Sequence, residues 1–182
     1  LGIKIPSLSS GLCWANSLTA NDPEERQRAF DMVVRQLYCA KMIGAETILV
    51  IPGSVSVEFV PEWGVVDYDV VWDRALEQIK KLAPIAEEAG VTLLIETNGV
   101  YANSARLADV LAQIGSDNVA ALWDWNHPYR FKGESPEQTI NHLGAYIKHC
   151  HINSFNRFRS CNLKMKTQFR KNHNATKRYD WN

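Results

Sequence analysis

Short apolar runs alternate with longer amphipathic segments along most of this chain. The short runs are rich in β-branched and aliphatic residues, which is typical of buried strands. They occupy residues 2–8, 47–51, 91–95, 119–123 and 146–152. The segments between them repeat apolar residues at helical spacing, which predicts helices. These helices are expected over residues 22–43, 69–89 and 104–114, with a fourth opening at residue 135.

Residues with known capping preferences mark the ends of the predicted helices. Asp22-Pro23 and Ser135-Pro136 each combine an N-cap side chain with a proline at the first helical position. Gly44 and Gly90 follow the last apolar residue of two helices, where glycine commonly ends a helix. The pattern therefore predicts an α/β protein whose strands are separated by helices.

Strands joined through helices are parallel, because each helix returns the chain to the same edge of the sheet. Two architectures satisfy this pattern: an open doubly wound sheet and a (β/α)8 barrel. No G-x-G-x-x-G motif follows any predicted strand, which argues against a dinucleotide-binding sheet.

Three successive strands end in side chains that bind metals. Glu96 and Asp124 close two of the strands, while His149 and His151 lie two residues apart near the end of the third. Side chains two apart face the same side of a strand, and neighbouring strands lie about 4.8 Å apart. A single carboxylate after a strand is most often a helix cap, but three such strand ends in succession favour a divalent metal site. Mn, Mg, Co and Zn suit this ligand set.

Charge and cysteine content narrow the class of protein. Residues 155–182 contain eight Lys or Arg and one Asp, so this segment carries +7 and the rest of the chain −7. We interpret residues 155–182 as a basic, disordered or aberrant tail, with a reading-frame change as one hypothesis for its origin, because they lack an apolar pattern. The four cysteines form no C-x-x-C pair, and no apolar run approaches the ~20 residues of a membrane span. We expect a cytoplasmic protein that binds neither membranes nor nucleic acid.

Five stretches together resemble the sugar phosphate isomerase/epimerase family, within the xylose-isomerase-like TIM-barrel superfamily. They read GIKIPSLSSG, IGAETILVIPG, LAPIAEEAGVTLLIET, ALWDWNHPYRFKGESPEQT and YIKHCHIN. The resemblance implies a partial (β/α)8 barrel over residues 1–154, covering roughly barrel strands 3 to 7. The chain is therefore interpreted as a fragment of a longer barrel.

The resemblance also implies roles for individual residues. Glu96, Asp124 and His151 match the metal ligands of the family, whose fourth ligand, a second Glu, has no match here. His127, in a D-x-x-H motif, matches a histidine that contacts substrate. Asn98 and Arg130 are assigned with it to substrate binding.

The expected reaction is metal-assisted proton transfer on a sugar or sugar phosphate through an enediolate, with Glu96 as the acid/base residue. The complete parent protein would then be an isomerase or epimerase, and we expect negligible activity from the 182-residue chain alone. Three alternatives stay open: an inosose-dehydratase-like lyase, an endonuclease-IV-like metal hydrolase and an inactive fragment. The oligomeric state, the metal and the sugar are not predicted.

Overall fold

The computed structural model describes residues 2–57 and 64–152. Within these residues a five-stranded parallel sheet has the strand order β1-β2-β3-β4-β5, so each strand pairs with the next along the chain. The strands are β1 (Ser7–Leu8), β2 (Thr47–Val50), β3 (Thr92–Glu96), β4 (Val119–Asp124) and β5 (Ile147–His151). The α-helices are α1 (Pro23–Ile43), α2 (Tyr68–Ala89), α3 (Ser104–Ile114), α4 (Asn126–Lys132) and α5 (Pro136–Leu143). Three 3-10 turns are η1 (Gly11–Trp14), η3 (Gly99–Ala102) and η4 (Gly144–Tyr146).

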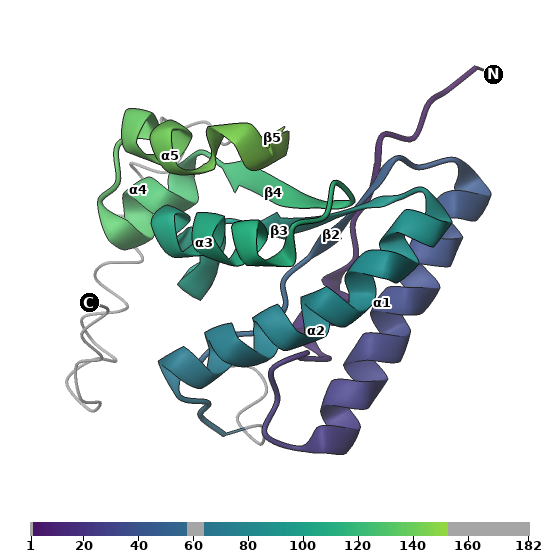
Figure 1. Cartoon of the computed structure of the whole chain (residues 1–182), viewed down its shortest axis with the longest axis horizontal. Helices are drawn as coiled ribbons and strands as arrows, with labels where there is room; N and C mark the ends of the chain where they lie inside the picture. Colours follow the sequence, from purple (N-terminus) through teal and green to yellow (C-terminus); the bar gives the residue numbers. More distant parts are fainter. Residues whose placement is uncertain (1, 58–63, 153–182) are drawn as a thin grey trace, which may run out of the picture. The chain divides into compact units, whose positions relative to one another are not determined.

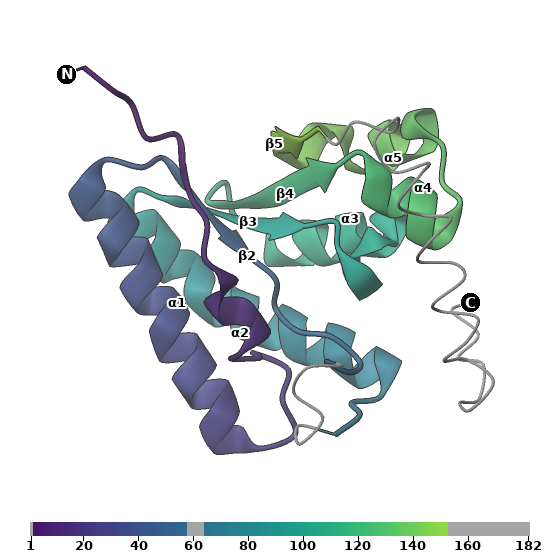
Figure 2. The same cartoon turned by 180° about the vertical axis from the view of Figure 1, so that it is seen from behind.

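Helices α1, α2 and α3 lie along the same face of the sheet, as the two opposite views in Figures 1 and 2 show. The apolar stripes of the helices pack on strands that are almost fully buried. Trp72 of α2 and Tyr101 of η3 are 2% and 1% exposed, and their rings meet edge to face with centroids 5.0 Å apart. Burying large aromatic side chains in this way is a major source of stability.

The predicted caps explain where the helices begin and end. The Asp22 side chain accepts a hydrogen bond from the backbone N–H of Glu24 at the start of α1. Ser135 and Gln138 form a complete capping box at the start of α5. Gly44 ends α1 with a φ of 73°, in the left-handed region that favours glycine.

Two elements differ from the prediction. The first strand was predicted over residues 2–8, but only Ser7–Leu8 pairs with β2. Residues 2–6 are exposed, and Pro6 has no N–H for a ladder, so the longer strand was wrong. Helix α4 was not predicted, because its sequence NHPYRFK has no apolar stripe and contains a proline.

The sheet has one irregularity, between β4 and β5. Ala121 pairs with Ile147, whereas the next residue, Leu122, pairs with His149. Lys148 is therefore the extra residue of a β-bulge. Its Nζ donates a hydrogen bond to the carbonyl of Asp117 at 2.6 Å. Beyond the bulge, Asp124 and His151 become direct neighbours across the two strands.

Candidate metal centre

The strand ends bring Glu96, Asp124 and His151 to one edge of the sheet. Each is the last residue of its strand: β3, β4 and β5 respectively. Glu96 pairs with Leu122, two residues before Asp124, so pleating places both carboxylates on the same face. His149 and His151 also share a face, with ring centroids 5.8 Å apart, as their spacing predicted.

Glu96 is buried, and both of its carboxylate oxygens are hydrogen-bonded. It is 6% exposed. Its Oε1 lies 2.9 Å from Nδ1 of His151, and its Oε2 accepts a 3.1 Å hydrogen bond from the Asn98 side-chain amide. A buried carboxylate needs such partners, since burial without them is costly. Asn98, predicted to bind substrate, therefore also orients the carboxylate of Glu96.

Asp124 is even more buried, at 3% exposed, and it also begins the helix that follows it. Its Oδ1 accepts a 2.9 Å hydrogen bond from the backbone N–H of Asn126, the first residue of α4. The N-cap of α4 is Trp125, which makes no side-chain cap bond, so Asp124 contacts the helix start from one residue further upstream. The other oxygen, Oδ2, lies 3.8 Å from Nε2 of His127. Asp124 thus combines a backbone contact at the start of α4 with a second oxygen directed toward an imidazole.

Thr97 joins the ends of β3 and β4 and was not singled out from the sequence. Its Oγ1 accepts a 3.0 Å hydrogen bond from the backbone N–H of Asp124, and its own backbone N–H donates to the carbonyl of Leu122 at 3.0 Å. Thr97 is fully buried. The sequence signal that could have identified Thr97 is its position directly after Glu96, the last residue of a strand.

Cys13, in η1, is a second residue that sequence reasoning did not connect to the site. Burial raises the pKa of its thiol, and the nearby Glu96 carboxylate raises it further. The thiol is therefore neutral, and its Sγ donates to the carbonyl of Ser10 at 3.2 Å. A neutral thiol is a poor metal ligand, and Cys13 is not part of the donor group described below.

Glu96, Asp124 and His127 form a group of donors suited to a metal ion, with one ligand atom from each lying within 4.8 Å of the others. Ligands at about 2.1 Å from one ion lie within about 4.2 Å of one another. A small side-chain movement would therefore let these residues share an ion. Two buried carboxylates held close together also repel each other, and a bound cation relieves that repulsion.

His127 belongs to this donor group, whereas His151, the expected ligand, contacts Glu96 but lies outside the group. His151 lies on a strand, and its Nδ1 is 2.9 Å from Glu96, a separation that two ligands of one ion can have. His127 lies on the short helix α4, against the ring of Phe131. Its buried Nδ1 has no hydrogen-bond partner among the described residues. Metal-binding histidines usually have their second nitrogen held by such a partner.

Arg130 lies apart from this group. It is exposed on α4, and its guanidinium stands 5.5 Å from the ring centroid of Phe131. No hydrogen bond or ion pair joins it to Glu96, Asp124 or His151 in the described part of the chain. The substrate contact expected of Arg130 stays a prediction.

A parallel sheet that carries clustered metal-type ligands at its carboxyl end defines a β/α-barrel class of protein. Residues 1–173 match the family described as Xylose isomerase-like TIM barrel, and the chain belongs to that family. Its five parallel strands form a half-barrel. The match runs past residue 154, where the predicted domain ends, into residues that lie outside the described ones.

Known proteins of this family that resemble the chain include sugar epimerases. It is 26% identical over 91 residues to a D-psicose 3-epimerase of Ruminiclostridium cellulolyticum, an alignment covering 47% of this chain and 31% of that protein. The structure of D-psicose 3-epimerase with D-tagatose from Clostridium cellulolyticum H10 superposes with a TM-score of 0.73 and 21% identity, covering 86% of this chain and 54% of that one.

A second structure, the IOLI protein with a bound zinc atom, has a TM-score of 0.66 and 16% identity, covering 82% of this chain and 51% of that one. The chain thus spans about half the length of these solved structures. Among the described residues, none of the helices has the length and apolar character needed to cross a membrane.

Proposed function

We propose that the complete protein containing this chain is a divalent-metal-dependent isomerase or epimerase of sugars or sugar phosphates. One observation carries the proposal: donor atoms of Glu96, Asp124 and His127 gather within 4.8 Å at the carboxyl end of the parallel strands, where His151 also contacts Glu96. The comparisons support it, because the sequence relative and the similar solved structure are both D-psicose 3-epimerase of strain H10, the structure being with D-tagatose. The zinc of the IOLI protein supports a metal in the same fold.

Glu96, Asp124 and His151 are the proposed ligands of this metal. His151 is preferred over His127 because it sits on a strand, directly beside Asp124, with its Nδ1 already against Glu96. His127 faces Asp124 from α4 and is proposed to contact the substrate. When bound, the metal supplies polarisation of the substrate carbonyl, which acidifies the adjacent C–H bond.

Glu96 is the proposed acid/base residue. Proton transfer needs a carboxylate held at a fixed position, and hydrogen bonds from Asn98 and His151 hold Glu96 in this way. Removal of the proton beside the carbonyl leaves an enediolate, and return of a proton gives the isomer or epimer.

Solvent deuterium exchange tests the function. A full-length barrel that carries residues 1–151 is incubated with a panel of ketoses and ketose phosphates in D2O, with Mn or Co added. We expect deuterium to enter at the carbon beside the carbonyl. Glu96→Gln should lower the rate by at least about a hundredfold, because general acid–base catalysis contributes about 10²–10⁴-fold.

The matched control is Gln113→Glu, an exposed change on α3 away from the strand ends. It should leave the exchange rate unchanged. Unchanged exchange by the Glu96→Gln variant would remove Glu96 from the reaction. Absence of exchange with every ketose of the panel would contradict the proposed function.

A further inference from the structure

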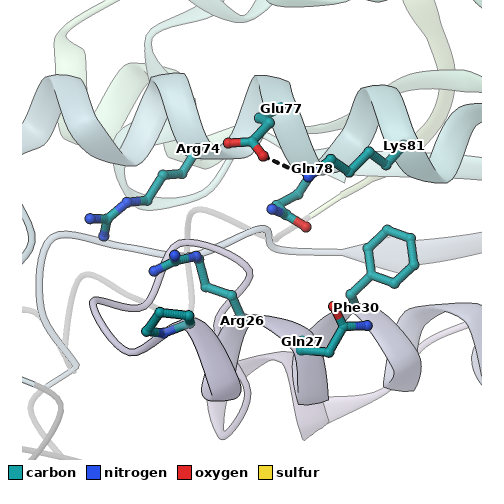
Figure 3. A pocket seen from close by; sticks show the side chains of 8 residues that line it. Arg26, Gln27, Phe30, Arg74, Glu77, Gln78 and Lys81 are labelled. Carbon is teal, nitrogen blue, oxygen red and sulfur yellow. Dashed lines mark hydrogen bonds and ion pairs between the residues drawn. The ribbon is translucent and has the colours of Figure 1, made fainter.

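A polar groove of about 370 Å³ lies between α1 and α2, and none of the strand-end residues lines it. Arg26 reaches into it from α1, and Arg74 and Lys81 reach in from α2 (Figure 3). Glu77 is the acidic residue among its lining side chains. Three cations against one anion give the groove a net positive charge.

The carboxylates in and near the groove form ion pairs with cations other than Arg26 and Arg74. Glu77 forms an ion pair with Lys81 at 2.6 Å, and the hydrogen bond from Lys81 is the main reason that the pKa of Glu77 lies below its ordinary value. The acids at the start of α1 lie 3.8–4.0 Å from Arg28. Arg26 and Arg74 form no ion pair with a described residue.

The two arginines instead converge on the loop before α1. Nη1 of Arg26 donates to the carbonyl of Ala20 at 2.7 Å, and Nη1 of Arg74 donates to the same carbonyl at 3.0 Å. Figure 3 shows their guanidinium groups facing each other across the gap between the helices. Glu77 is the anion near both arginines, which help to lower its pKa, but its carboxylate is paired with Lys81.

Holding the loop uses only part of the hydrogen-bonding capacity of each arginine. All the hydrogen bonds described for both side chains run through Nη1, to acceptors of residues 19–21. A guanidinium has five N–H donors. The remaining donors have no acceptor among the described residues, and their fork geometry matches the oxygens of a phosphate.

We propose that this groove binds a small phosphate-bearing metabolite, with its phosphate group between Arg26 and Arg74. Gln27 offers polar contacts to the rest of the molecule, and the half-buried ring of Phe30 offers an apolar one. The groove lies between two helices on the outside of the sheet. This phosphate site is therefore separate from the proposed metal centre and does not depend on the proposed reaction.

Isothermal titration of the 182-residue chain with inorganic phosphate and pyrophosphate tests the site, in EDTA so that a bound metal does not contribute. We expect saturable binding with one phosphate or pyrophosphate per chain, weakened by salt. Gln27→Glu adds a negative charge to the groove while keeping both arginines. It should weaken binding by about fivefold or more at low ionic strength.

Two further variants test whether the phosphate binds in the groove rather than at another part of the chain. Gln113→Glu makes the same change in net charge on α3 and should leave the affinity unchanged. Glu96→Gln should also leave it unchanged. Equal weakening by the Gln27 and Gln113 variants, loss of binding in the Glu96 variant, or absence of saturable binding would each overturn the proposed site.

Discussion

Glu96 and Asp124 differ in how their oxygens are used, although both are buried strand-end carboxylates. Both oxygens of Glu96 contact side chains, those of His151 and Asn98. Asp124 uses one oxygen to begin α4 and directs the other toward His127. Replacing Asp124 would therefore disturb the start of α4 as well as a proposed metal ligand, whereas Glu96 accepts no hydrogen bond from a backbone N–H.

The two histidines of the site allow a direct test of the ligand assignment. We predict that His151→Ala weakens binding of Co or Mn by at least tenfold, because it removes a proposed ligand; even changes outside the ligand shell typically cost 10–100-fold. His127→Ala should have a smaller effect, because its ring is held by packing rather than by a hydrogen bond. Equilibrium dialysis of the 182-residue chain against each metal measures both affinities.

His142→Ala is the control, because this histidine lies on α5 beside Ser104 and away from the strand ends. Its metal affinity should match that of the unaltered chain. A larger loss of metal affinity for His127→Ala than for His151→Ala would make His127 the metal ligand in place of His151.

The sequence predicted the positions of those site residues that end a strand, because the strands themselves could be predicted. The apolar runs before Glu96 and Asp124 correctly predicted that these residues end β3 and β4. The proximity of His127 to both carboxylates was not predictable, since it depends on α4. That helix is stabilised by tertiary contacts and by Asp124 rather than by an apolar stripe.

At the scale of elements, caps were the most informative signals. Asp22 and Ser135 begin α1 and α5 as predicted, and Gly44, Gly90 and Gly115 follow three helices. The predicted start of β1 was wrong because a strand needs a hydrogen-bonded neighbouring strand. Local sequence does not show where that neighbouring strand ends. Only two residues of β1 face β2.

Glu134 joins α3 to the segment that leads into α5. One of its carboxylate oxygens lies 3.2 Å from the backbone nitrogen of Ser104, and the other is hydrogen-bonded to the hydroxyl groups of Ser104 and Thr139. We predict that Glu134→Ala lowers the free energy of unfolding by about 2 kcal/mol, because it leaves the buried backbone N–H of Ser104 without an acceptor. Urea denaturation followed by circular dichroism measures the change.

Glu87→Ala is the control for Glu134, since Glu87 is exposed near the end of α2. Its effect should stay within about 0.5 kcal/mol. An effect of Glu134→Ala no larger than this control would show that the contact between α3 and α5 does not depend on the carboxylate.

Gly53 marks a close approach between the chain after β2 and the loop before α1. A Cβ atom at this position would lie 1.9 Å from Oγ1 of Thr19 and 2.5 Å from Oγ of Ser17. We predict that Gly53→Ala destabilises the fold by about 1–3 kcal/mol, because neither buried side chain has room to move. Gly11→Ala, where a Cβ meets nothing within 4 Å, should be nearly neutral in the same urea titration.

At the scale of the whole molecule, the metal centre links binding to folding. Its proposed ligands come from three strands that are far apart in sequence, so the site exists only in the folded chain. We predict that Mn or Co at about one hundred times its dissociation constant stabilises the chain by about 2.7 kcal/mol. Differential scanning calorimetry should show a higher melting temperature, which EDTA reverses.

The variant Glu96→Gln should lose most of this metal-dependent rise while unfolding cooperatively without metal. Equal stabilisation of the variant and the unaltered chain would locate the metal elsewhere.

The prediction of a basic tail over residues 155–182 lies outside the described residues and stays a prediction. The alternation of strand and helix predicted a parallel α/β sheet and left two architectures open, and the partial barrel was predicted from the family resemblance.

The β-bulge at Lys148 determines which single-residue deletion β5 can accept without a change of register. The ladder between β4 and β5 pairs Ile147 with Ala121 and His149 with Leu122, and it leaves Lys148 without a partner in the register. A deletion of this one codon would therefore leave Asp124 opposite His151, whereas most single deletions in a strand reverse every side chain beyond them. Within β5, position 148 can therefore be deleted or inserted in evolution while Asp124 and His151 stay paired across the two strands.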